Sequence, residues 1–600
     1  VAEVVARAGG SPLFAEELAR LAAAGRESRA APTIEAAIQV SLDALSPECR
    51  DAVGRLSVLG LTTWDSALTA LGLPNAAELM RELAAFEILL EQDNSRFPSA
   101  REFVFKHALI RDVAYAALDA DNHRELHALA GEWLARMGGD AATVAGHLDA
   151  GGRPELACVH WLRAAERALA THALGDALSM AERALAYAEP GPAGFQSARI
   201  LDEAWSRLDP RAADRETAIT ALDDFAYDEP SRVVADGARA RYDDARGRGG
   251  DIDRRLAETL TAAASLGMGE ELARCSATLA ARAAFAGDFE VAEAEAQRLL
   301  ELANRELPSA RVDAYQTLAV IRQAKGAVST ALEARKSAAG AAREAGLKER
   351  ESMLTTNLGF ALSTIGARQE AREALEKGLL LAEAVGSAGA ARHAQMNLLG
   401  WSALYGTDRQ LDGYLAEARA EADAAATGLW AAPDRSNLGV LFYRGVELLL
   451  GSAPARVRAL SLLRMAVESY RSLGHRDVLP GALAAWAEGL RLDGSPGEAA
   501  EVAGEAAELL EQGAPSLLNE APVFLTLYKA QLDLGDEGAA TLAIQRGLPF
   551  LSRRLQGLLG SPYARGFLTD LPYNAELVSA ADRQGLLPEA VRGAFARSTN

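Results

Sequence analysis

Apolar residues along most of this chain recur every three to four positions, the spacing of helices that bury one face. One stretch departs from this pattern. Phe103 and Phe105 point to the same side, as in a short strand, and from residue 108 the spacing becomes helical, with Leu109 and Val113 on one face. The pattern predicts that a strand ends and a helix begins at His107.

The sequence before this junction predicts a small mixed domain. Its expected helices are Thr33–Leu45, Pro47–Leu59 and Ala76–Phe86, and its expected strands are Ile88–Gln92 and Glu102–Phe105. Ser46-Pro47 is a strong helix start, because the serine can cap the helix and a proline in the first turn loses no hydrogen bond. Three helices followed by a hairpin of strands predict a winged-helix domain over residues 33–140.

After residue 140 the chain predicts a helical repeat, which we align on the glycines between paired helices. These glycines are Gly287, Gly326, Gly366, Gly406, Gly494 and Gly535. Successive gaps are 39, 40, 40, 88 and 41 residues, and the gap of 88 fits two units of 44. With fainter turns near residues 172, 210 and 250, the pattern predicts about ten helical hairpins over residues 141–560.

Residue sizes around each turn glycine indicate the type of repeat. For the turn at Gly366, the residue seven positions earlier is small (Gly359) and the residue eight positions earlier is large (Leu358). The residue five positions after the turn glycine is alanine (Ala371). Small residues let two helix axes approach, and large residues fill the groove beside them. The pattern resembles tetratricopeptide repeats, with a period near 40 instead of the usual figure of about 34.

The predicted fold class is therefore mainly α, a winged-helix domain followed by a tetratricopeptide-like α-solenoid superhelix. Stacked repeats of this kind form a curved groove that suits a protein, a peptide or a small effector. Nothing in the sequence identifies the ligand. The aromatic residues Trp401, Tyr405, Trp430, Tyr443 and Trp486 are scattered along the array, and we expect most of them in the core.

Charge argues against a nucleic-acid or membrane partner. The chain has a formal net charge of −21, which repels nucleic acid and anionic lipid. The predicted winged helix has nine basic residues against 17 acidic ones, a net charge of −8, and its third helix carries Arg81 against Glu78 and Glu82. Because DNA binding needs a basic face, a DNA-binding regulator is the weakest function that we consider.

Several kinds of site are not predicted. Cys49, Cys158 and Cys275 are far apart and lack CxxC spacing, which favours a reducing cytoplasm over a disulfide framework or a zinc site. No run of about 18 apolar residues predicts a membrane span. His123 and His127 lack the glutamate spacing of a zinc protease, and we expect His127 to pack in its helix. We therefore expect no catalytic residue, no metal and no cofactor bound by this chain alone.

The first residues contain a turn, from Gly9 to Pro12, followed by a helix with Phe14 and Leu18. On its residues alone this segment is a capped pair of helices. The Gly-x-Pro-Leu turn and the Glu-Glu-Leu helix also resemble the lid region of signal-transduction ATPases with numerous domains, which include NB-ARC proteins and bacterial maltose-type regulators. The resemblance implies that residues 1–32 are the remnant of an ATPase helical lid, and that Pro12 packs against adenine in a longer parent protein.

The segment from Lys106 to Ala114 is similar to the Met-His-Asp motif of NB-ARC winged-helix domains, although Lys106 and Ala108 replace the methionine and the aspartate. In that family the histidine contacts the β-phosphate of ADP, so the resemblance implies this role for His107. The alternative, from the residues alone, is that His107 only caps or packs at the junction.

A narrower resemblance covers residues 103–147, the stretch from Trp161 and the closing segment Phe567–Asn574. These parts are similar to bacterial ATPase–repeat proteins that are linked to a Ser/Thr kinase or a nucleotidyl cyclase. The resemblance implies that residues 561–600 are a C-terminal cap, and that the chain is part of a longer signalling protein.

These features together predict a regulatory or sensor module and not an enzyme. The repeats would bind a protein, peptide or small effector, and the winged helix would couple binding to an upstream ATPase domain that holds ATP or ADP with Mg²⁺. Pro12 and His107 would contact ADP only together with that domain, because the chain contains no P-loop. A protein-interaction scaffold without a switch is the main alternative.

The variant Leu358→Asp tests the repeat register. If Leu358 faces a helix crossing, the variant buries a carboxylate, which costs several kcal/mol unless it is paired, and the local repeats melt at a lower temperature. Thermal unfolding followed by circular dichroism measures the change. Unchanged melting would mean that Leu358 does not occupy the crossing.

Overall fold

The computed structural model describes residues 14–16, 18–19, 33–248, 251–305, 307–425, 438–514, 516 and 518–596. About 77% of the residues are helical, which confirms the predicted mainly α class. Contacts divide the chain into two compact units, Val1–Arg255 and Leu256–Asn600. The two units are described separately below.

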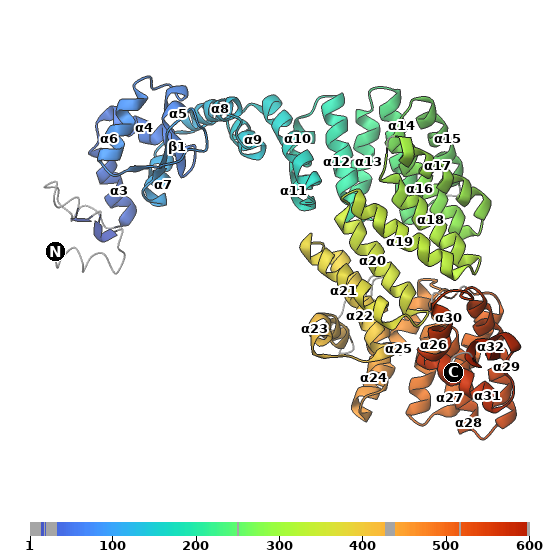
Figure 1. The fold of residues 1–600 in the computed structure, drawn as a ribbon. Helices are drawn as coiled ribbons and strands as arrows, with labels where there is room; N and C mark the ends of the chain where they lie inside the picture. The colour runs from blue at the N-terminus through green and yellow to red at the C-terminus, as the bar shows by residue number, and fades with distance from the viewer. Residues whose placement is uncertain are drawn as a thin grey trace. The chain divides into compact units, whose positions relative to one another are not determined.

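The first unit begins with helices around a three-stranded antiparallel sheet (Figure 1). The elements are α3 (Ile34–Asp43), α4 (Pro47–Ser57), β1 (Thr62–Trp64), α5 (Asp65–Ala70), α6 (Ala76–Ala85), β2 (Leu89–Glu91), β3 (Glu102–Phe105) and α7 (Ala108–Ala116). Strand β3 lies in the middle, with Thr63 opposite Phe103 and Leu90 opposite Val104. The predicted helices α3, α4 and α6 and both predicted strands are confirmed, whereas β1 and α5 were missed.

The strand-to-helix junction is where the pattern predicts it. Phe103 and Phe105 are buried together, so the predicted alternation is confirmed. Helix α7 packs against α3 and α4 mainly through Ile110 and Ala114, which lie beside the predicted face. Leu109 and Val113 are only partly buried at the edge of this core.

The first unit continues as a chain of antiparallel helices. They are α8 (Ala120–Arg136), α9 (Ala141–Ala150), α10 (Pro154–Ala170), α11 (Leu174–Tyr187), α12 (Pro192–Leu208), α13 (Ala213–Phe225) and α14 (Glu229–Arg246), and α15 (Ile252–Ser265) crosses the unit boundary. Each of the helices from α8 to α13 packs against the next one in the sequence.

The second unit consists of helical hairpins and a short C-terminal group of helices. Its elements are α16 (Gly269–Ala286), α17 (Phe289–Arg305), α18 (Ala310–Ala324), α19 (Val328–Glu344), α20 (Lys348–Ser363), α21 (Arg368–Ala384), α22 (Ala388–Tyr405), α23 (Arg409–Ala425), α24 (Leu438–Leu449), α25 (Ala453–Ser472), α26 (Leu479–Leu492), α27 (Pro496–Glu511), α28 (Ala521–Asp533), α29 (Glu537–Gln556), α30 (Tyr563–Thr569), α31 (Pro572–Arg583) and α32 (Glu589–Ala596). Hairpins form between α16 and α17 and between each later pair up to α28 and α29.

Glycines end the helices at both kinds of turn. All six turn glycines on which the sequence was aligned have a left-handed backbone, with φ between 75° and 89°. A second series, between hairpins, has φ between 68° and 86°: Gly267, Gly346, Gly386, Gly474 and Gly513. Side chains disfavour this conformation, which explains why glycine recurs where the chain must reverse.

Small residues set the distance between the paired helices α20 and α21. A Cβ atom on Gly359 would lie 2.7 Å from Leu375 Cγ, and one on Gly378 would lie 2.2 Å from Thr356 Oγ1. Leu358 is half-buried, packs against the apolar core and also lines an open hollow beside Lys336 and Lys377. Leu375, which meets Gly359, is fully buried.

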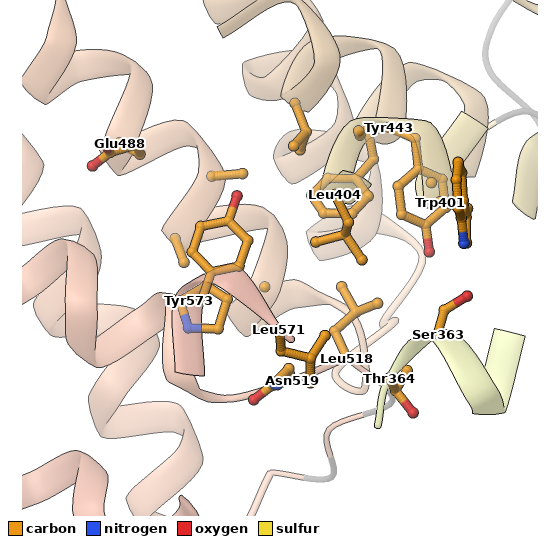
Figure 2. Close-up of a pocket in the computed structure, with 18 of the residues that line it drawn as sticks. Ser363, Thr364, Trp401, Leu404, Tyr443, Glu488, Leu518, Asn519, Leu571 and Tyr573 are labelled. Atoms are coloured by element: carbon orange, nitrogen blue, oxygen red, sulfur yellow. The ribbon is translucent and has the colours of Figure 1, made fainter. Parts of the chain in front are cut away.

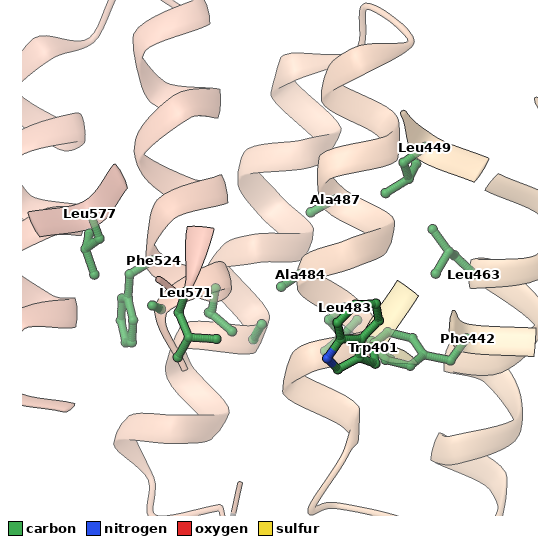
Figure 3. Close-up of a cluster of buried hydrophobic side chains, with 14 of the residues drawn as sticks. Trp401, Phe442, Leu449, Leu463, Leu483, Ala484, Ala487, Phe524, Leu571 and Leu577 are labelled. Atoms are coloured by element: carbon green, nitrogen blue, oxygen red, sulfur yellow. The ribbon is translucent and has the colours of Figure 1, made fainter. Parts of the chain in front are cut away.

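The first helices of successive hairpins form one layer of the second unit. Helices α20, α22, α24, α26 and α28 pack in this order, and α31 continues the layer after α28. The apolar core between them includes Trp401, Phe442, Leu483, Phe524 and Leu571, each less than 8% exposed (Figure 3). One continuous core therefore spans several hairpins, as expected of stacked repeats.

The C-terminal segment returns to hairpins that lie about 200 residues earlier in the chain. Ser329 N donates a hydrogen bond to Gly557 O at 3.2 Å, and Tyr563 Oη donates to Glu370 Oε2 at 2.9 Å. A Cβ atom on Gly366 would lie only 2.4 Å from Gly566 O. These contacts attach the end of α29 and the start of α30 to the turns before α19 and α21.

Among the described helices, none combines the length and the apolar character that crossing a lipid bilayer would require.

The variants Gly366→Ala and Gly386→Ala test this return contact. Both glycines have positive φ, but nothing lies within 4 Å of a Cβ atom on Gly386. Gly386→Ala should cost about 1–2 kcal/mol of backbone strain, and Gly366→Ala should cost more because the methyl group displaces Gly566. Denaturant unfolding measures both losses, and hydrogen exchange of α30 should accelerate only in Gly366→Ala. Equal losses with unchanged exchange would contradict the contact.

Candidate functional site

His107 lies between β3 and α7, as predicted, with an extended backbone at φ −137° and ψ 138°. His107 occupies the N-cap position of α7, but its side chain makes no capping hydrogen bond, so of the alternative interpretation only packing at the junction remains. Nε2 is buried and has no hydrogen-bond partner among the described residues. The Oε2 atom of Glu16 lies 3.8 Å from Nε2.

Lys106 brings the N-terminal residues to this junction. Its Nζ donates hydrogen bonds to the carboxylates of Glu16 and Glu87, the latter at 2.7 Å. These two bonds, first that to Glu16, raise the pKa of Lys106 above its usual value. Glu16 therefore lies next to both Lys106 and His107, whereas Pro12 lies outside the described residues.

The predicted packing of His127 is confirmed, and His127 belongs to a connected group of rings. Its Nε2 lies 2.9 Å from Tyr115 Oη, and its Nδ1 lies 3.0 Å from His147 Nδ1. His123 Nε2 donates to the backbone carbonyl of Tyr115 at 2.8 Å, and its ring stacks on the tyrosine ring. Nowhere in the described ranges do three or more histidine, cysteine or carboxylate side chains form a group that could hold a metal ion.

Burial lowers the pKa of two histidines of this group, His147 and His127. The pKa of His147 falls to about 4, mainly because the ring is buried and secondly because of the neighbouring His127. Burial also lowers the pKa of His127, followed by the charges of His123 and Arg111. Between two neutral imidazoles one Nδ1 donates and the other accepts, and this bond between α8 and α9 is lost when both rings are protonated, because both Nδ1 atoms then only donate.

The second candidate site is a cavity of about 120 Å³ in the inner layer of the second unit (Figure 2). Its walls come from α20, α22, α24, α26, α28 and α31, together with the loop before α28 and Leu571 just before α31. The large apolar and aromatic side chains that line it are Phe360, Trp401, Leu404, Phe442, Tyr443, Val446, Leu449, Leu518, Leu571 and Tyr573. Most of the lining belongs to first helices of hairpins, and none of the described lining residues lies on a second helix.

The polar groups of the cavity fall into two classes. Glu488 is held by Arg491, whose Nε and Nη2 each donate to its carboxylate at 2.8 Å, and Asn519 Nδ2 donates to Asn574 Oδ1 at 2.8 Å. The hydroxyls of Tyr443 and Tyr573 have no hydrogen-bond partner among the described residues. Burial raises the pKa of both, that of Tyr573 to about 12, so both hydroxyls are donors at neutral pH.

Sequence reasoning missed this cavity. It placed Trp401 and Tyr443 in the core, which is confirmed for Trp401 at 3% exposed, yet both also line the cavity. Tyr573 was not singled out at all. A usable signal was present, because Trp401 and Tyr443 lie on first helices shortly before the turns at Gly406 and Gly451, and first helices form the inner layer.

No family model matches this chain, and no curated protein matches it. Among solved structures, it is similar to a signal-transduction ATPase with numerous domains that has a tetratricopeptide repeat sensor, from Pyrococcus horikoshii. The identity is 12%, over 93% of this chain and 70% of that chain, with a TM-score of 0.34. It is also similar to yeast Tom70, at 13% identity over 78% and 100% of the two chains, with a TM-score of 0.31.

A third similar structure is the APC/C hetero-tetramer Cut9-Hcn1, at 13% identity over 73% of this chain and 96% of that chain, with a TM-score of 0.24. These neighbours are tetratricopeptide-like repeat proteins. Because every TM-score is below 0.5, the repeat architecture described above rests on this chain's own helices and turns.

The histidine group predicts a pH dependence of stability. The pKa of His147 is lower in the folded chain than its unfolded value of about 6.5. The unfolded chain therefore binds more protons as the pH falls below that value, and stability is lost from pH 7 toward pH 4. We expect a loss on the order of 1–2 kcal/mol between pH 7 and pH 5, and a smaller loss in His147→Gln. An NMR titration that gives His147 a pKa near 6.5 would contradict this.

Proposed function

We propose that this chain is a sensor or protein-interaction module in which the helical repeats hold a partner or effector. The observation that carries the proposal is the array of hairpins, whose first helices join in one layer around an aromatic-lined cavity. Stacked repeats present side chains from many helices to a single ligand, an arrangement suited to recognition.

We also propose that residues 33–140 form a winged-helix domain. The order α4, β1, α5, α6, β2, β3 and the sheet order β1-β3-β2 support this assignment. In such domains the third helix contacts DNA in many regulators. Here that helix, α6, exposes Glu78 beside Arg81, which favours a contact with protein over one with nucleic acid.

The proposed coupling runs from the repeats through the winged helix to an upstream ATPase domain. Its support is the contact of Glu16 with Lys106 and His107, since Glu16 follows Pro12 by four residues. This contact brings a residue of the lid-like segment to the junction that resembles the Met-His-Asp motif. Pro12 and His107 would then belong to one site in the parent protein.

ADP with Mg²⁺ would be held in the parent mainly by the ATPase domain, and its phosphates would supply the negative charge that distinguishes one state of the switch from the other. His107 fits a role there, because its Nε2 is buried without a partner among the described residues and can donate a hydrogen bond to an oxygen. The negative carboxylate of Glu16 would repel a phosphate beside His107. Its hydrogen bond to the positively charged Lys106 reduces this repulsion.

A scaffold that binds partners without any switch is the second candidate function. It requires only the repeats and makes no use of His107. The two functions differ in one measurable respect, since a scaffold binds its partner equally well whichever nucleotide the parent protein holds.

His107→Ala in the full-length protein tests the coupling. We expect ADP to dissociate about tenfold faster from the variant, which corresponds to the loss of one hydrogen bond to a charged group. Release of a fluorescent ADP analogue measures the rate. His160→Ala, on helix α10, is the matched control and should release ADP at the wild-type rate. An unchanged rate of ADP release in His107→Ala would contradict the proposed phosphate contact and favour the scaffold function.

A further inference from the structure

We infer that the cavity of the inner layer binds a small neutral organic molecule with one ring-sized apolar group and one hydrogen-bond acceptor. The inference rests on the proposed function, because it names the class of effector that the repeats would sense. It is argued from the size of the cavity, its lining and its two unpartnered hydroxyls.

The size of the cavity limits the ligand to about one ring. Its volume is about 120 Å³, and an apolar protein cavity of about 150 Å³ stays dry and binds benzene. The walls come from six helices and two further segments, and the space between them is partly open. A single ring or a branched aliphatic group of similar size fits.

The lining favours an aromatic or compact apolar group. Figure 2 shows Tyr573 on one side of the cavity and Trp401 and Tyr443 on the other, with Leu404, Leu518 and Leu571 between them. A ring that enters this space meets both aromatic and aliphatic surfaces. Aromatic pairs add about 0.5–1.5 kcal/mol beyond the burial of their surface.

The polar groups of the cavity favour a ligand that carries a hydrogen-bond acceptor. The hydroxyls of Tyr443 and Tyr573 make no hydrogen bond to another described residue, so each is free to donate one to a ligand oxygen. The one carboxylate in the lining, Glu488, is neutralised by Arg491. A cation therefore gains little here and loses its hydration, so the ligand is neutral.

Two probes of nearly equal shape test this assignment. Acetophenone has one ring and a carbonyl acceptor, and ethylbenzene has the same ring without the acceptor. Isothermal titration calorimetry of each probe with the 600-residue chain gives the two affinities. We expect both to bind, with acetophenone about tenfold tighter than ethylbenzene, and the double variant Tyr443→Phe and Tyr573→Phe to bind them equally.

Two further variants locate the binding. Ala485→Leu adds three carbon atoms to the lining and should abolish binding of both probes. Tyr405→Phe is the matched control, because Tyr405 Oη bonds to Ser363 O at 3.3 Å and the residue does not line the cavity. It should keep the wild-type preference. The Tyr→Phe variants each lose only an oxygen atom, so they remain informative if Ala485→Leu fails to fold.

Three results would overturn the inference: no binding of either probe, equal affinity for the two probes in the wild-type chain, or binding that Ala485→Leu leaves unchanged. The last result would place the probes elsewhere on the chain. ADP release from the full-length protein is independent of these titrations. If the probes bind but His107→Ala does not change ADP release, the cavity site is supported and the nucleotide coupling is contradicted. If His107→Ala speeds ADP release but no probe binds, only the cavity site is contradicted.

Discussion

The structure depends on one interaction, the close approach of paired helices through glycine and alanine. No hairpin buries its apolar face alone, so each needs both its internal contact and its neighbour. Gly359 and Gly378 let α20 and α21 approach until Leu375 and Thr356 touch the opposite backbone. Repetition of such contacts produces one apolar cluster that extends through the hairpins from Val328 to Val591.

The cavity is a consequence of the same rule. Glycines of this layer make room for side chains of the cavity wall: a Cβ atom on Gly400 would lie 2.8 Å from Tyr443 Cε1, and one on Gly481 would lie 2.6 Å from Leu518 Cδ1. These contacts hold the walls in fixed positions while the irregular shapes of the rings leave space between them. A preformed pocket of this kind loses little free energy when a ligand binds, because its walls are already ordered.

Local patterns predicted much of the fold. Helix periodicity and glycine spacing identified the hairpin turns, and the alternation at Phe103 and Phe105 identified β3, because these signals depend only on neighbouring residues. β1 was missed because a strand of three residues shows no alternation. The dual role of Trp401 was missed because periodicity does not distinguish a core position from one beside a cavity, and the position of Trp401 on a first helix was not used. The role of His107 stays a prediction, and that of Pro12 lies outside the described residues.

The return of the C-terminal segment to the turns before α19 and α21 has a mechanical consequence. A linear repeat array frays from its last unit, where only one neighbour holds each helix. In the second unit the last helices have a second attachment about 200 residues earlier, through Gly557 and Tyr563. The last helices therefore cannot unfold one at a time from the C-terminal end while this second attachment holds. Force applied there must detach α30 before any hairpin between the two attachments can unravel.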